Sequence, residues 1–143
     1  MKTVSELLRV QSTRPVVRVA PGDSVLEAIK VLAREDVGAA VVLDGERLAG
    51  IFSERDYTRK VILQGRSSDA TRVHEIMTAN VICVPPTASI RDCMALMVEK
   101  GIRHLPVRDG ERVVSMVSIR DIVGDLVADH EFTINQLQNY INS

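Results

Sequence analysis

An internal repeat is the feature that most constrains the fold of this chain. When the sequence is shifted by 65 residues against itself, residues 19–57 align with residues 84–122 without a gap, and 11 of the 39 pairs are identical. A chain of 143 residues is short enough for one compact domain. A unit of about 60 residues has a small core and is only marginally stable alone. We therefore expect two pseudo-symmetric units that share a core around an internal two-fold axis.

Both copies predict the same order of elements. Each begins with a short apolar strand and then a serine, Ser24 or Ser89, that can cap an amphipathic helix. Two further strands follow, joined by an Asp-Gly-Glu-Arg turn, and a second helix begins after Ser53 or Ser118. The predicted fold class is α/β (α+β): a tandem pseudo-two-fold pair, β-α-β-β-α in each repeat, with extra N- and C-terminal helices.

The helices outside the repeats define the predicted domain limits. We expect residues 1–67 to form the first repeat with an N-terminal helix, residues 68–130 the second repeat with its lead-in helix, and residues 131–143 a C-terminal helix. The C-terminal helix, from about Phe132 to Asn142, carries an apolar stripe that would cover the chain's own core or pack on a second subunit. This stripe consists of Ile134, Leu137, Tyr140 and Ile141.

Composition excludes several classes of function. Eighteen Lys and Arg against nineteen Asp and Glu give a net charge of -1, so no general electrostatic attraction to nucleic acid is expected. The sequence contains no apolar run of about 18 residues, so no membrane insertion is expected. Cys83 and Cys93 lie in apolar runs, which favours buried thiols in a reducing cytoplasm. No nucleophile motif and no metal-ligand spacing is found, so we expect neither an enzyme nor a metal site.

Several motifs together carry a resemblance to a known family. They are Val73-x-x-Ile76-Met77-Thr78, Val81-Ile82-Cys83-Val84-x-Pro86, Gly101-Ile102-Arg103-His104-Leu105-Pro106-Val107, the Gly50–Tyr57 segment and Ser118-x-x-Asp121. In combination they resemble the cystathionine-beta-synthase (CBS) domain family, whose members occur as tandem pairs called Bateman modules. The likeness is to small stand-alone bacterial CBS-pair proteins and covers nearly the whole chain.

This resemblance implies a regulatory function. Such a module senses energy state or metabolites by binding an adenosyl ligand between its repeats: AMP, ADP or ATP, with NAD(H) or S-adenosylmethionine as further candidates. It requires no cofactor, although ATP could bring Mg²⁺. It also implies a homodimer and a regulated enzyme or transporter as partner.

The repeated Ser-x-x-Asp segment has chemistry that suits such a ligand. An ionised Asp56 or Asp121 can accept hydrogen bonds from both hydroxyls of a ribose. Ser53 or Ser118 stands where a helix begins, and free amides there favour a phosphate. The same spacing is also close to a capping box, in which the two side chains only stabilise the helix start.

The remaining predicted site residues come from the resemblance. It implies that Arg103 and His104 reach the phosphate of a ligand held by Asp56, and that strand lead-ins at two positions, Val16 and Val81, receive the adenine. Apart from the resemblance, an arginine directly precedes each aspartate, and we expect it either to face phosphate or to neutralise its neighbour. These residues are Arg55 and Arg120. Two rival functions stay open, a dimerising scaffold without a working ligand site and a small enzyme.

Overall fold

The structure, a computed structural model, describes residues 2–10 and 15–142. The N-terminal helix is α1 (Val4–Val10), and the first repeat contains β1 (Arg18–Val19), α2 (Val25–Glu35), β2 (Ala39–Asp44), β3 (Arg47–Ser53), α3 (Glu54–Tyr57) and the π-helical turn η1 (Thr58–Ile62). The second half contains α4 (Val73–Ile76), α5 (Ile90–Lys100), β4 (His104–Asp109), β5 (Arg112–Ser118) and α6 (Ile119–Asn142). The mixed α/β fold with terminal helices is therefore as predicted.

The two capped helices begin and end at aligned positions. Ser24 accepts a hydrogen bond from the Glu27 amide at 3.1 Å, which caps α2, and Ser89 caps α5 in the same way. Both helices end in the left-handed conformation, α2 at Asp36 (φ 54°) and α5 at Gly101 (φ 64°). The repeat therefore extends to the local geometry of each helix end.

The sheets of the two repeats differ in their first strand. In the first repeat, β1 pairs in parallel with β2, and β2 pairs antiparallel with β3. In the second repeat, β4 and β5 pair antiparallel, but the strand expected before them is reduced to one bridge, Val84 to Val107. Val41 in β2 donates its amide to the Val17 carbonyl at 3.1 Å, whereas the aligned residue of β4 is Pro106, which has no N–H. The missing donor explains why the predicted strand shortens.

The lead-in helices pack on the repeat that does not follow them in the chain. Val4 and Leu7 of α1 belong to the core of the second repeat, and Val73 and Ile76 of α4 belong to the core of the first. Backbone hydrogen bonds hold both: Val4 donates to the Ala88 carbonyl and Val73 to the aligned Asp23 carbonyl, each at 2.9 Å. Each repeat thus completes its core with a helix that precedes the other.

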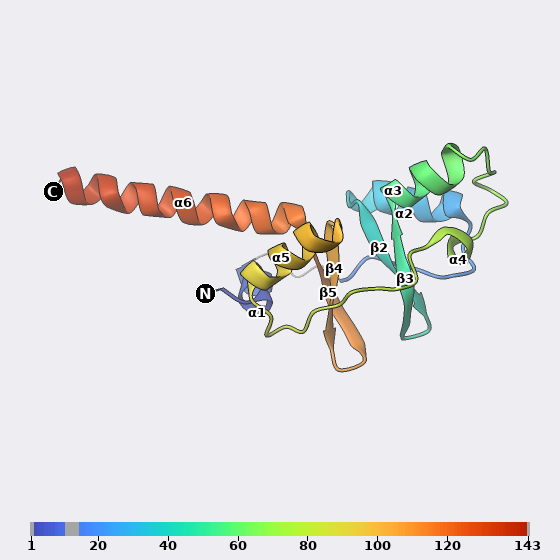
Figure 1. Ribbon diagram of the computed structural model, residues 1–143, viewed down its shortest axis with the longest axis horizontal. Helices are drawn as coiled ribbons and strands as arrows, with labels where there is room; N and C mark the ends of the chain where they lie inside the picture. Colours follow the sequence, from blue (N-terminus) through green and yellow to red (C-terminus); the bar gives the residue numbers. More distant parts are fainter. Residues whose placement is uncertain (1, 11–14, 143) are drawn as a thin grey trace.

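A third apolar cluster joins the two sheets. Val41 and Leu43 of β2 meet Val113 of β5 there, and all three are buried. Figure 1 shows the two hairpins side by side at the centre of the body, with α1 and α5 at one end and α2, α3 and α4 at the other. The repeats therefore share an interface between their sheets.

The C-terminal region differs from the prediction. The helix that follows Ser118 and the expected C-terminal helix are one continuous helix, α6, which extends away from the body (Figure 1). No proline interrupts this segment, so nothing in its backbone ends the first helix. Ile134, Leu137 and Ile141 are 53%, 58% and 77% exposed, so the expectation that they cover the chain's own core is wrong. The side chain of Tyr140, the fourth predicted stripe residue, lies outside the described part.

Gly50 supplies a test of how tightly the two halves join. A Cβ at Gly50 would lie 2.7 Å from the Thr78 carbonyl oxygen, whereas a Cβ at Gly22 would meet nothing within 4 Å. Because backbone must shift to admit it, we expect Gly50→Ala to lower the free energy of unfolding by about 1–3 kcal/mol. Gly22→Ala is the matched control and should change it far less. Urea denaturation of both variants measures the difference, and equal effects would contradict the close approach.

Candidate functional site

Two clefts lie between the repeats. The first cleft, about 390 Å³, has the start of α3 from the first repeat on one wall and residues of the second repeat on the other. The second cleft, about 460 Å³, has the start of α6 on one wall and residues of the first repeat on the other. Both volumes fall in the range of small-molecule sites, about 300–1,000 Å³.

The two clefts are related by the same 65-residue shift as the sequence. Ile51, Val81 and Ile82 line the first cleft, and the aligned Met116, Val16 and Val17 line the second. Four residues line both clefts, and they are Gly38, Glu54, Arg103 and His104. The sequence repeat therefore predicts not only the fold but a pair of facing sites that meet at the pseudo-two-fold axis.

All ten predicted site residues lie on the walls of these clefts. The first cleft contains Ser53, Arg55, Asp56 and Val81, and the second contains Val16, Ser118, Arg120 and Asp121. Arg103 and His104 lie between them and belong to both. The structure thus brings Asp56 into one cavity with Arg103 and His104, the combination that the resemblance implied.

Asp56 forms a capping box with Ser53 at the start of α3. Asp56 donates its amide to the Ser53 hydroxyl at 3.1 Å, and the carboxylate accepts from the Ser53 amide at 3.2 Å and hydroxyl at 3.0 Å. The Asp56 side chain is only 11% exposed. The capping box that the sequence offered as an alternative is therefore present. It uses only Oδ2 of the Asp56 carboxylate, so Oδ1 is left for other partners.

Lys60 and Thr78 occupy the other oxygen of Asp56. The Lys60 ammonium lies 3.1 Å from Oδ1, and the Thr78 hydroxyl donates to it at 3.4 Å. Lys60 also donates to the Ile76 carbonyl at 3.0 Å, which ties η1 to α4. Sequence reasoning missed both residues as neighbours of this carboxylate. The i, i+4 spacing of Asp56 and Lys60 on one helical segment was the available signal.

Asp121 has fewer partners than Asp56. It forms the same reciprocal pair with Ser118, which donates its amide to Oδ2 at 2.8 Å and accepts from the Asp121 amide at 3.2 Å. The position aligned with Lys60 is Asp125, which forms an ion pair with Lys2 instead. Within residues 2–10 and 15–142, no hydrogen bond to Oδ1 of Asp121 is found. The two carboxylates therefore differ in charge compensation although their caps are alike.

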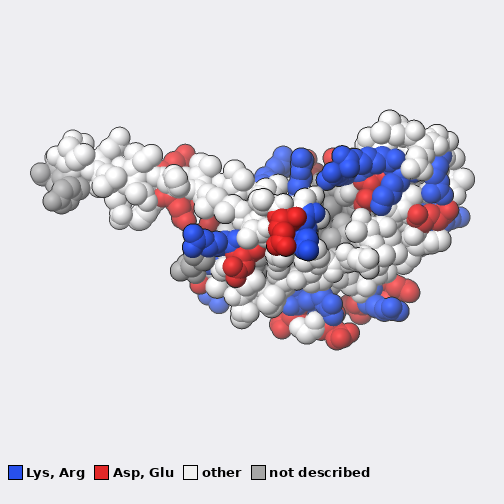
Figure 2. Space-filling model, in the orientation of Figure 1, with Lys and Arg blue, Asp and Glu red and all other residues white. Residues whose placement is uncertain are grey.

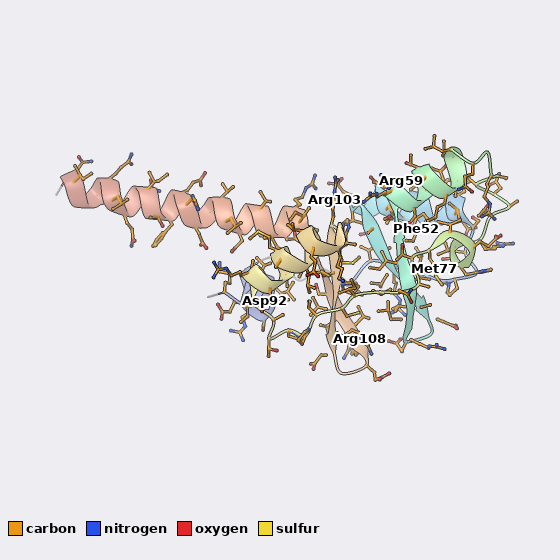
Figure 3. All side chains as sticks on the ribbon, in the orientation of Figure 1. Phe52, Arg59, Met77, Asp92, Arg103 and Arg108 are labelled. Carbon is orange, nitrogen blue, oxygen red and sulfur yellow. The ribbon has the colours of Figure 1, made fainter. Side chains whose placement is uncertain are left out.

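The shared wall carries one cation, Arg103, together with Glu54 and His104. Arg103 stands at the junction of the two halves, on the same edge as Arg59 (Figure 3), and basic side chains gather along this edge in Figure 2. Burial lowers the pKa of His104, with Asp121 opposing and Arg103 adding to the effect. His104 is therefore mainly neutral at pH 7. Gly38 lies beside its imidazole, and a Cβ there would be 3.5 Å from Cε1 of His104.

A weak cross-repeat contact lies at the first cleft. Arg55 donates to the Gly101 carbonyl at 3.4 Å, so the guanidinium reaches from the first repeat to the end of α5. Together the cleft offers apolar side chains that can cover a ring, a carboxylate beside a helix start, and two guanidinium groups that can pair with an anion. Such a set can bind a molecule that is apolar at one end, polyhydroxylated in the middle and anionic at the other.

Other kinds of site find no support in the described residues. Within them, no group of three or more His, Cys, Asp or Glu side chains could hold a metal ion. Over the same part of the chain, no helix combines the length and the hydropathy needed to cross a bilayer.

Comparison with known proteins agrees with this geometry. The CBS domain matches residues 4–62 and 73–128. The chain is 42% identical over 124 residues to the mitochondrial CBS domain-containing protein CBSX3 of Arabidopsis thaliana. The match covers 83% of this chain and 60% of that protein. The structure of a CBS-domain protein from Burkholderia ambifaria MC40-6 superposes with a TM-score of 0.87 and 48% identity, over 90% of this chain and 96% of the other.

Two similar structures hold adenosyl compounds. The CBS pair of protein MJ0100, solved with 5′-methylthioadenosine and S-adenosylmethionine, is 25% identical with a TM-score of 0.79 and covers 90% of this chain and 98% of its own. The CBS domain protein PAE2072 from Pyrobaculum aerophilum, solved with AMP, is 27% identical with a TM-score of 0.75. The match covers 89% of this chain and 99% of that one. With both repeats matched and the fold shared, the chain belongs to the CBS-domain family, as a tandem CBS pair.

Proposed function

We propose that this chain is a regulatory module that binds an adenosyl ligand between its two repeats and does not itself catalyse a reaction. The observation that carries the proposal is the composition of the first cleft, where Asp56, Arg55 and Arg103 surround one cavity with apolar walls. The ligand-bound neighbours support the adenosyl class. AMP, ADP and ATP are the proposed ligands because two guanidinium groups favour phosphate.

Each part of the proposed ligand has a matching group in the first cleft. Val81, Ile82 and Ile102 form an apolar surface for the adenine. Asp56 accepts from the ribose hydroxyls through Oδ1, in competition with the Lys60 ammonium at 3.1 Å and the weaker 3.4 Å bond from Thr78. Arg103 and Arg55 pair with the phosphate, and Arg55 gives up its long bond to Gly101 to do so.

Binding across the cleft would regulate through the relative placement of the repeats. A ligand that contacts both walls favours the arrangement in which both contacts form, and it shifts the population by its difference in affinity between arrangements. We propose that a regulated enzyme or transporter reads this arrangement. We also propose a homodimer, supported by the exposed apolar side chains of α6, and a cytoplasmic location, consistent with the free Cys83 and Cys93.

Replacing Asp56 separates ligand binding from helix capping. In Asp56→Asn the carbonyl oxygen can still accept from Ser53, but the charge that strengthens a ribose contact is lost. We expect the Kd for AMP to rise at least about tenfold, since a hydrogen bond to a charged group contributes about 1.5–3 kcal/mol. Isothermal titration calorimetry measures the affinity, and thermal unfolding without ligand measures the cap.

Lys60→Gln is the matched control for Asp56→Asn. It also breaks the Asp56 ion pair, but it leaves the carboxylate in place. It should therefore bind AMP at least as tightly as the parent chain. A lowered Tm with unchanged AMP affinity in Asp56→Asn would mean that this carboxylate only caps the helix. Asp121→Asn then tests the second cleft in the same assay.

The lowered pKa of His104 predicts a pH-dependent share in anion binding. An anion beside the imidazole favours its protonated form, so binding of AMP raises the pKa of His104 and takes up a proton. His104 thus contributes more at pH 5.5 than at pH 7.5. We expect the ratio of AMP affinities between the parent chain and His104→Gln to increase as the pH falls, and calorimetry at both pH values measures it. Comparison at equal pH cancels the titration of AMP itself, and a constant ratio would place His104 away from the phosphate.

The rival scaffold function predicts a different result. A ligand that binds only the folded state at 100 times its Kd adds about 2.7 kcal/mol to the free energy of unfolding. Millimolar AMP, ATP and S-adenosylmethionine should therefore raise the Tm of the parent chain. If none of them does, and mass spectrometry finds no nucleotide released from the purified protein, the scaffold function is favoured instead.

A further inference from the structure

The exposed face of α6 has a regular pattern that the ligand clefts do not explain. Six residues form what we call the α6 stripe, and they are Val123, Val127, His130, Ile134, Leu137 and Ile141. The five aliphatic members are 50%, 52%, 53%, 58% and 77% exposed in chain order. His130 is exposed as well. So much apolar surface in one line requires a partner.

The spacing of the α6 stripe is that of a coiled coil. Its members follow one another in steps of four, three, four, three and four residues, the alternation of positions a and d in a heptad. At about 100° per residue, these six positions stay within about 80° of one another around the helix. Phe132, 63% exposed, lies about 180° from the centre of the stripe. The heptad spacing therefore marks one face of α6, and Phe132 is exposed apolar surface outside that face.

Only the start of α6 is supported by the body. Ile122 is fully buried in the core of the second repeat, and Asp125 forms an ion pair with Lys2 at 2.5 Å. The α6 stripe is turned about a quarter of a circle from Ile122, so the body does not cover it. Most of the stability of a helix in a protein comes from packing of its apolar face. The distal turns of α6 therefore need another surface for their own stability.

The charge pattern selects the kind of partner. Residues 132–142 contain no Lys, Arg, Asp or Glu, and the outer part of α6 carries no blue or red surface in Figure 2. A symmetric dimer places the same patch opposite itself, so any charge there would meet its own sign. The α6 stripe avoids this, and two copies of it supply matching a and d positions to each other. Binding of α6 in a groove of a different protein would not require a heptad spacing along α6.

We infer that α6 pairs with α6 of a second copy of this chain, with the α6 stripe as the seam of a two-stranded coiled coil. This assignment rests on the homodimer included in the proposed function and names its surface. It does not depend on which ligand binds in the clefts.

Two aspartate substitutions on the same helix test the assignment. Leu137→Asp places a charge in the α6 stripe, whereas Phe132→Asp places the same charge on the opposite face. In sedimentation equilibrium of the full chain, we expect the parent and Phe132→Asp to be dimers. The dimer dissociation constant of Leu137→Asp should be at least tenfold higher. Ile134→Asp should behave as Leu137→Asp does.

The alternative results distinguish the two proposals. A dimer that survives Leu137→Asp and Ile134→Asp as well as it survives Phe132→Asp would overturn the α6 assignment while the homodimer stands. A monomeric parent chain would overturn both. Calorimetry with AMP and thermal unfolding of each variant show whether the body is still folded and still binds AMP. A variant that loses the dimer, AMP binding and the melting transition together has unfolded, and that result would count against the assignment.

Discussion

The structure depends on the exchange of lead-in helices between two repeats that cannot complete their cores alone. Val4 and Leu7 fill the second repeat and Val73 and Ile76 fill the first, at aligned backbone positions. This exchange links each unit to the chain segment that precedes the other, so the two units are held together before any ligand is present. It also passes the chain from α4 through residues 78–82, so that Val81 and Ile82 face the start of α3. The clefts are a consequence of how the cores are closed.

In each cleft, the cap formed by the aspartate and its proposed contact with a ligand do not exclude each other. The capping box uses Oδ2 of Asp56 and Oδ2 of Asp121, which fixes each side chain at a helix start. A fixed carboxylate loses little entropy when a ligand contacts it, so capping prepares the group for binding. The motif alone presented the cap and the ligand contact as alternatives, but the cap uses Oδ2 and leaves Oδ1 for the proposed ligand contact. What distinguishes the clefts is the neighbour four residues on, Lys60 in one and Asp125 in the other.

The sequence predicted those features of the fold that depend on local pattern and on the internal repeat. The repeat order and the helix caps at Ser24 and Ser89 follow from alignment of the two copies, because each is set by nearby residues. The other cleft-lining positions came instead from the resemblance to the CBS family, and they are Val16, Val81, Arg103 and His104. The exchange of α1 and α4 is long-range packing, which no period in the sequence records. The shortened strand before β4 could have been read from Pro106, since its missing N–H removes the bond that Val41 makes. The predicted limit between residues 130 and 131 was wrong because no residue there ends a helix, and the apolar stripe that suggested a separate element continues along α6.

The continuity of α6 joins the second cleft to the C-terminal end of the molecule. Its first turn carries Ile119 and Asp121 on the wall of the second cleft, and the same helix continues without interruption to Asn142. A helix rises about 1.5 Å per residue, so a change in tilt at the cleft displaces the far end most. If pairing of α6 favours one tilt, a ligand in the second cleft that favours the same tilt strengthens the dimer, and the dimer strengthens ligand binding by the same factor. One uninterrupted helix would therefore be sufficient to couple the proposed ligand site of the second cleft to the proposed dimer surface of α6.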